Sequence, residues 1–153
     1  MNITRMIKLS LIPLLVAMLF SCNNYNHNKV LIIGIDGCKP DALLKAETPN
    51  IDKLWKNGSY SFSATTDRLT ISGLCWSSML TGVWHEKHNV TTNKYLKPNI
   101  KKYPHFFKRV KQFNPDLRTY SIVNWKPVND ILERGDADFV QTFETDEEVV
   151  KKT

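Results

Sequence analysis

A continuous apolar run from Val30 to Ile35 ends on Asp36 and Gly37, and it is the feature that most constrains the fold. β-branched residues dominate the run, which is typical of a strand buried on both faces of a parallel sheet. A carboxylate at the end of a buried strand needs a cation or hydrogen-bond donors to offset its desolvation. From its position alone, Asp36 is either a metal ligand or the cap of a turn that Gly37 permits.

Patterns typical of helices and strands alternate along the rest of the chain. The sequence predicts helices over Pro40 to Lys45, Thr48 to Trp55 with a stop at Asn57-Gly58, Ser72 to Thr81 with a stop at Gly82, Tyr103 to Phe113, and Val128 to Arg134. It predicts further strands over Tyr60 to Thr65, Leu117 to Val123 and Asp138 to Phe143. Strands separated by helices favour parallel pairing, so we expect an α/β layered sheet.

The last ten residues, Glu144 to Thr153, have the pattern of a new helix with a capping threonine and an acidic first turn. No further strand follows this helix in the sequence. We therefore expect the chain to be the N-terminal piece of a longer protein, with its fold incomplete here.

Residues 1–21 are expected to be a leader that takes no part in the fold. Arg5 and Lys8 give it a basic start, and Leu9 to Phe20 form an apolar centre. Leu19-Phe20-Ser21-Cys22 resembles the lipobox of bacterial lipoproteins, in which the cysteine is acylated and becomes the new N-terminus.

An ordinary secretion signal and a retained membrane helix are the alternatives to this lipoprotein signal. Against the helix, an apolar centre of roughly 18 Å is shorter than a bilayer core of about 30 Å. We therefore expect an exported protein that Cys22 anchors by lipid to a bacterial membrane, on the periplasmic or cell-surface side. Residues 22–28 would form a polar tether, and residues 29–153 would begin the catalytic domain.

Charge and cysteine content exclude some classes of function. The net charge of +6 includes two positive charges of the leader, so the remainder is too small to indicate nucleic-acid binding. Cys38 and Cys75 form no CxxC pair or zinc-ribbon spacing, and they are either a disulfide or two small buried apolar residues. Five basic residues cluster as on the solvated face of a helix: Lys101, Lys102, Lys108, Arg109 and Lys111.

Ser72 stands immediately before the predicted helix that ends at Gly82. At a helix start, its hydroxyl would meet free backbone N–H groups and the positive end of the helix dipole, where an oxyanion is stabilised. The alternative is an N-cap serine with no chemical role.

Taken together and in order, these stretches resemble the alkaline phosphatase superfamily, and most closely its type I phosphodiesterase/nucleotide pyrophosphatase branch. The stretches that carry the resemblance are Ile33 to Asp41, Thr48-Pro49-Asn50-Ile51, Ser72 to Gly82, and His88. The resemblance implies an alkaline-phosphatase-like fold with a largely parallel sheet flanked by helices. Ser72 is followed by Leu74 and Trp76 rather than proline and arginine, which disfavours a formylglycine sulfatase.

The same resemblance implies a hydrolase with two divalent metal ions, usually zinc. In it Asp36 would ligate one metal, and Ser72 would be the nucleophile between both. The family supplies its remaining ligands from segments well downstream, and we expect them beyond Thr153. His85 and His88 are three residues apart, but the family pattern there indicates a turn rather than a pair of metal ligands.

Two hypotheses on function stay open. The first is a metal-dependent hydrolase of small-molecule phosphate esters, inactive as this piece alone. The second is a non-catalytic surface lipoprotein or binding module that kept the fold and lost the metals.

Overall fold

A computed structural model describes residues 29–153, which fall into two units, residues 29–35 and residues 36–153. The predicted leader, Cys22 and the polar tether lie outside the described residues. No helix within residues 29–153 has the length and apolar character that a membrane crossing requires.

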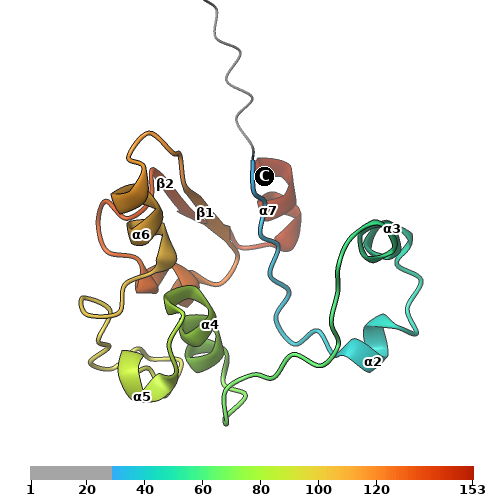
Figure 1. The fold of residues 1–153 in the computed structure, drawn as a ribbon, viewed down its shortest axis with the longest axis horizontal. Helices are drawn as coiled ribbons and strands as arrows, with labels where there is room; N and C mark the ends of the chain where they lie inside the picture. The colour runs from blue at the N-terminus through green and yellow to red at the C-terminus, as the bar shows by residue number, and fades with distance from the viewer. Residues whose placement is uncertain (1–28) are drawn as a thin grey trace, which may run out of the picture. The chain divides into compact units, whose positions relative to one another are not determined.

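The second unit contains short helices and two strands (Figure 1). Its elements are α2 (Pro40–Leu43), α3 (Pro49–Asn57), α4 (Ser72–Thr81), α5 (His85–His88), α6 (Phe106–Phe113), β1 (Tyr120–Val123), the 3-10 helix η1 (Lys126–Ile131), β2 (Phe139–Thr142) and α7 (Asp146–Lys152). The helices predicted within residues 40–57, 72–81, 103–113 and 128–134 are confirmed, with shifted ends in most cases. Gly82 follows α4 with a left-handed φ of 70°, as a C-terminal stop requires.

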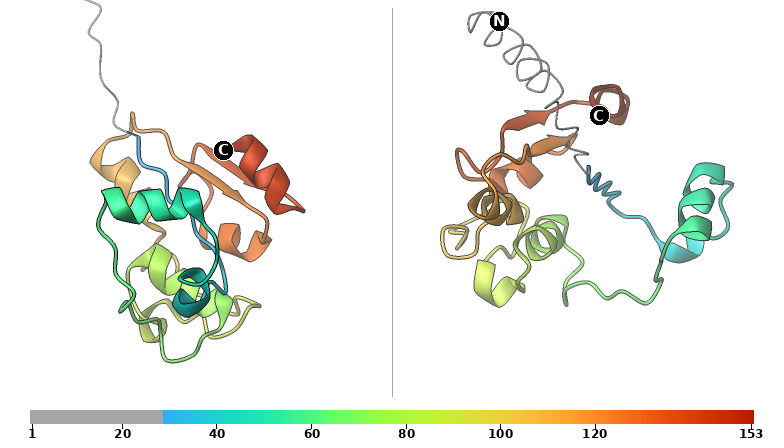
Figure 2. Two further views of the ribbon diagram at one scale, coloured as in Figure 1. Left: turned by 90° about the vertical axis from the view of Figure 1, so that its right-hand side faces the viewer. Right: turned by 45° about the horizontal axis from the view of Figure 1, so that its top comes forward.

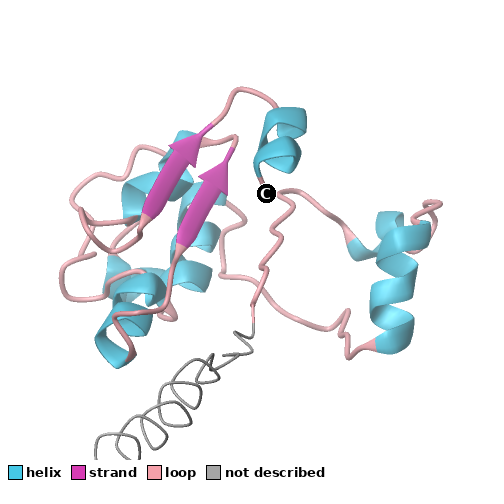
Figure 3. Ribbon diagram, turned by 90° about the horizontal axis from the view of Figure 1, so that it is seen from above, coloured by secondary structure: helices cyan, strands magenta, loops and turns pink. Residues whose placement is uncertain are grey.

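Strands β1 and β2 pair in parallel, with Tyr120 opposite Phe139 and Val123 opposite Thr142. Both arrows point the same way when seen from above (Figure 3), and η1 lies in the connection between them. The further views in Figure 2 show the same pair. Parallel pairing with a helical crossover confirms the predicted α/β class, with a small sheet.

Two predicted strands are wrong. Residues 30–35 and 60–65 have no regular secondary structure, and Val30 and Ile33 are 87% and 69% exposed. A strand is defined by hydrogen bonds to a neighbour, and in the described part of the chain the sheet consists of β1 and β2 alone. Local composition, β-branched in residues 30–35 and partly aromatic in residues 60–65, gave these segments a propensity for a strand but could not provide a partner.

Helix α4 contributes most to the core of the second unit. Leu74 and Leu80 of α4 are buried together with Val90 and Ile131. α4 contacts both α5 and η1, so the helix that begins at Ser72 is packed against two neighbouring elements.

Two helix starts carry side-chain caps. Nδ1 of His105 accepts a hydrogen bond from the N–H of Phe107 at the start of α6. Thr145 and Glu148 form a reciprocal capping box at the start of α7, which confirms the predicted capping threonine.

Candidate functional site

Asp36 lies in a turn and is exposed, rather than at the end of a buried strand. Gly37 follows it with a φ of 67°, a left-handed value that glycine adopts without strain. The turn that Gly37 permits is present, but the Asp36 side chain accepts no hydrogen bond within residues 29–153 and so does not cap it. The premise of a buried carboxylate is wrong, because the preceding run is exposed and unpaired within the described sheet.

Ser72 is the first residue of α4 and is partly exposed, while Ile71 occupies the N-cap position. The prediction of an N-cap serine is therefore wrong by one position. The first four N–H groups of a helix have no partner within the helix, so Ser72 stands among donors that can face an anion. The N–H of Cys75 is bound to the Ile71 carbonyl at 2.9 Å, which closes the first turn.

Asn93 is a residue of this site that the sequence reasoning missed. Its Oδ1 accepts a hydrogen bond of 2.8 Å from the N–H of Gly73, next to Ser72. A Cβ at Gly73 would lie 2.9 Å from the Thr92 carbonyl oxygen, so only glycine permits this approach. Asn93 is twenty residues from Gly73 in the sequence, and only its polar, turn-forming neighbourhood could have drawn attention to it.

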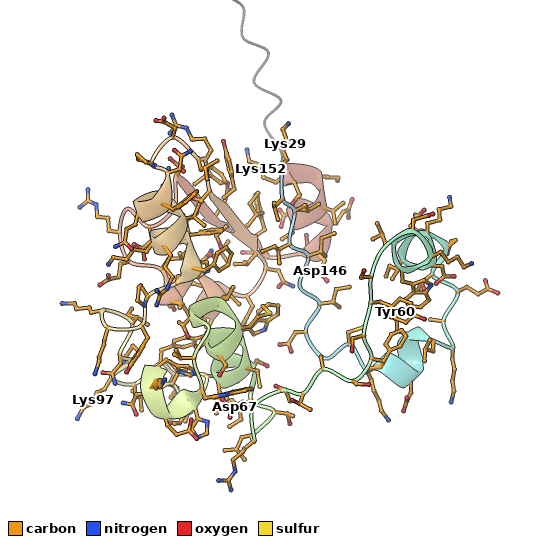
Figure 4. The ribbon with its side chains drawn as sticks, in the orientation of Figure 1. Lys29, Tyr60, Asp67, Lys97, Asp146 and Lys152 are labelled. Carbon is orange, nitrogen blue, oxygen red and sulfur yellow. The ribbon has the colours of Figure 1, made fainter. Side chains whose placement is uncertain are left out.

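Asp67 is the most strongly bonded carboxylate near α4 and α5. Its side chain is 3% exposed and accepts hydrogen bonds from Ser78 at 2.9 Å and from Nδ1 of His85 at 2.7 Å. Burial raises its pKa, but these bonds and those from the N–H groups of Arg68 and His85 outweigh burial and hold the pKa at about 2. Figure 4 labels Asp67 in this region. Asp67 therefore stays ionised at neutral pH.

His88 is fully buried and connects to Asp67 through a serine. Its Nδ1 accepts a hydrogen bond of 3.0 Å from the N–H of Val90, so the ring proton is on Nε2. Nε2 lies 2.9 Å from Oγ of Ser78, and the Ser78 hydroxyl donates to Asp67. Burial lowers the pKa of His88, so the ring is neutral near pH 7.

This Ser–His–Asp set cannot act as a nucleophilic triad. A triad needs a histidine nitrogen that accepts the serine proton, but here Nε2 of His88 carries a proton and donates to Ser78. The set instead ties α4 to α5. The prediction that His85 and His88 form a turn and not a metal pair agrees with these contacts, and Asn89 follows with a φ of 58°.

Further polar groups outside this set are also held by local contacts. His105 is 2% exposed, stacks on Phe106 and contacts the Phe107 ring at a tilt, and burial lowers its pKa to about 4. The pKa of Asp138 is held well below its usual range, mainly by the hydrogen bond from Lys111 and next by that from the N–H of Thr119. Cys38 and Cys75 are free thiols, so the disulfide alternative is not formed, and Cys38 is exposed.

An open hollow of about 540 Å³ lies beside α6, but it does not include Asp36 or Ser72. Lys108 in its lining pairs with Glu133 at 2.6 Å, and nearby Lys111 pairs with Asp138 at 2.7 Å. The basic side of α6, predicted to be solvated, is thus partly neutralised by acidic partners. Arg134 also lines the hollow and has no ion-pair partner within residues 29–153, but Glu133 and Asp136 share the same lining, so its mixed charges do not define a ligand.

Metal-ligating residues are sparse in the described part of the chain. Residues 29–153 hold no group of three or more His, Cys, Asp or Glu side chains that could bind a metal ion. Asp36 and Ser72 offer one carboxylate and one hydroxyl. A catalytic zinc usually takes three protein ligands, so these two do not by themselves complete a zinc site.

Comparison with known proteins identifies the family. The sequence profile of the type I phosphodiesterase / nucleotide pyrophosphatase family matches residues 30–141, which includes Asp36, Ser72 and Asn93. The chain belongs to this family. Its members are phosphate ester hydrolases that generally depend on metals, and the resemblance read from the sequence is confirmed.

A human relative, ectonucleotide pyrophosphatase/phosphodiesterase family member 7, is 28% identical to this chain over 76 residues. The matched segment covers 50% of this chain and 17% of the human protein. No solved structure gives a significant match to the chain.

Proposed function

We propose that the full-length protein hydrolyses phosphate esters of the phosphodiesterase or nucleotide pyrophosphatase type, with Ser72 as its nucleophile. The observation that carries this proposal is the position of Ser72 at the start of α4, inside the matched family region. The human relative named above is called a pyrophosphatase/phosphodiesterase, which supports the same reaction class.

The chemistry follows from the groups around Ser72. Its Oγ would attack phosphorus while the bond from phosphorus to the ester oxygen breaks, and the leaving alcohol takes up a proton. Water would then hydrolyse the phosphoserine and restore the hydroxyl. The N–H of Gly73 already donates to Asn93, so the other N–H groups of the first turn that lack an intrahelical partner would stabilise charge that develops on the phosphoryl oxygens.

Asn93 supports this assignment by its place beside Ser72. Its Oδ1 is already bound by the N–H of Gly73, which fixes the orientation of the amide. Its Nδ2 makes no hydrogen bond within residues 29–153 and is therefore free to donate to a phosphoryl oxygen.

Metal dependence is a further part of the proposal. Asp36 and Ser72 carry oxygen atoms that can ligate divalent cations. Two zinc ions are the proposed cofactors. Because the two residues do not complete a site, the other ligands would come from outside residues 29–153. We expect the described residues alone to bind metal weakly and not to turn over substrate.

The test uses the full-length protein and a nitrophenyl phosphodiester. We expect hydrolysis that requires zinc, is lost on chelation and falls by at least about a thousandfold in Ser72→Ala, as for loss of a nucleophile. Ser78→Ala is the matched control, because Ser78 lies in the same helix but bonds to Asp67 and His88. Unchanged turnover in Ser72→Ala would overturn the assignment and direct attention to Thr70.

A non-catalytic surface lipoprotein or binding module is the second candidate. The absence of a metal cluster within residues 29–153 is the observation that favours it. Metal content decides between the two: fewer than one bound zinc per full-length protein, with no hydrolysis, would support the binding module.

Export and lipid anchoring at Cys22 are also proposed, on the basis of the lipobox-like tetrapeptide. Metabolic labelling with a fatty acid should mark the wild-type protein and not Cys22→Ala. A Cys22→Ala protein that is still labelled and still sediments with membranes would contradict this anchor.

A further inference from the structure

The loop of residues 89–98 is closed by hydrogen bonds at its base. The N–H of Asn99 donates to the His88 carbonyl at 2.8 Å, and Nδ2 of Asn99 donates to the Lys87 carbonyl at 3.1 Å. Across the loop, Nδ2 of Asn89 donates to the Lys97 carbonyl at 2.9 Å. These bonds fix both ends of the loop against α5.

Three residues of this loop other than glycine have a positive φ: Asn89 at 58°, Tyr95 at 49° and Lys97 at 51°. Asparagine tolerates this conformation, but tyrosine and lysine seldom adopt it. Such conformations persist only where the surroundings determine them, and they cluster at functional sites. Lys97 is exposed at the edge of the molecule (Figure 4), whereas Tyr95 is partly buried.

Tyr95 reaches the same residue of α4 as Asn93 does. Its hydroxyl donates to the Gly73 carbonyl at 3.4 Å, and Oγ of Ser77 donates to that carbonyl at 2.6 Å. Burial raises the pKa of the Tyr95 hydroxyl, so it remains a donor at neutral pH. The N–H and C=O of Gly73 are thus both bound by the loop, one by Asn93 and the other by Tyr95.

We propose that Tyr95 is a positioning residue that holds the 89–98 loop on the first turn of α4 and so fixes Asn93 beside Ser72. Its partly buried ring carries most of this effect, because a hydroxyl bond of 3.4 Å is long. The expected effect on kcat rests on the proposed function. The expected effect on the position of the loop does not.

The kinetic test compares three variants of the full-length protein on a nitrophenyl phosphodiester. Tyr95→Asn removes the ring with a residue that tolerates the positive φ, Tyr95→Phe keeps the ring, and Lys97→Asn makes the same change at the other strained position. We expect kcat to fall by about tenfold or more in Tyr95→Asn with KM changed by less than about threefold, because an Asn93 displaced from Ser72 no longer supports the chemical step.

Tyr95→Phe should restore kcat to within about threefold of the wild type, and Lys97→Asn should leave it unchanged. A Tyr95→Phe variant as slow as Tyr95→Asn would overturn the proposal, because the hydroxyl would then act in the reaction itself. Equal rates in Tyr95→Asn and Lys97→Asn would also overturn it.

Hydrogen exchange tests the structural part without any need for turnover. The N–H of Gly73 has no partner within α4 and depends on Asn93 for protection. Mass spectrometry of peptides over residues 69–76 should show faster exchange in Tyr95→Asn, and wild-type exchange in Tyr95→Phe and Lys97→Asn. Unchanged exchange in Tyr95→Asn would overturn the positioning role. Hydrolysis by the Ser72→Ala variant at the wild-type rate would overturn only the proposed function.

Discussion

Nε2 of His88 lies 2.9 Å from Oγ of Ser78, and the N–H of Val90 occupies the opposite ring nitrogen of His88. The histidine is therefore a donor to the serine and not its base. The Ser78 hydroxyl donates a hydrogen bond to Asp67, which also accepts one from His85. This network connects α4 with α5 and with the base of the 89–98 loop.

Ser78→Ala should reduce stability and leave hydrolysis intact. It removes two partly buried hydrogen bonds and leaves His88 and Asp67 each without one partner, at a cost of about 1–3 kcal/mol in the free energy of unfolding. Urea unfolding of the full-length protein measures this loss. A fall in kcat as large as that of Ser72→Ala would contradict the purely structural role of Ser78.

Stability should decrease as the pH falls below about 6.5. Burial lowers the pKa of His88, and it lowers that of His105 to about 4, so the unfolded chain binds protons that the folded chain does not. His105 contributes to the free energy of unfolding above pH 6.5. That contribution is lost as the pH falls towards about 4, a change of roughly 3 kcal/mol.

The His105→Asn variant isolates this contribution. Asparagine can still accept from the N–H of Phe107 as an N-cap, but it does not titrate. Thermal melting between pH 7 and pH 4 should show a weaker pH dependence in this variant than in the wild type. Identical pH profiles would show that His105 is not the group responsible.

Gly73→Ala should destabilise the protein although alanine is the better helix former by about 1 kcal/mol. The added Cβ would lie 2.9 Å from the Thr92 carbonyl, so the loop must move or the helix must shift, at about 1–3 kcal/mol. Met79→Ala, on an exposed position of α4, is the matched control and should be close to neutral. A Gly73→Ala protein as stable as that control would contradict the close approach of the loop.

Thr145→Ala should weaken α7 by about 1 kcal/mol, since it removes the side-chain acceptor for the N–H of Glu148. Thr145→Ser keeps that acceptor and should stay near the wild type. Hydrogen exchange over residues 145–152 measures the difference, and equal protection in both variants would count against the capping box.

Local patterns predicted most of the helices and two of the strands but misjudged the other two strands. Ser72 to Thr81, with Gly82 after it, carries its start and stop in adjacent residues, and the helix forms within those limits. Leu117 to Val123 and Asp138 to Phe143 contain β1 and β2, which find each other as partners. Val30 to Ile35 has equal propensity, yet it has no partner in the described sheet and is not a strand.

The sequence by itself determined the family, the helix that carries Ser72 and the turn after Asp36, because each depends on residues close together in the chain. Only the tertiary structure decided that Asn93 and Tyr95 bind Gly73, and that His88 donates to Ser78. Those contacts join residues ten to twenty-two positions apart. They depend on how the 89–98 loop packs on α4, and no local spacing in the sequence specifies that packing.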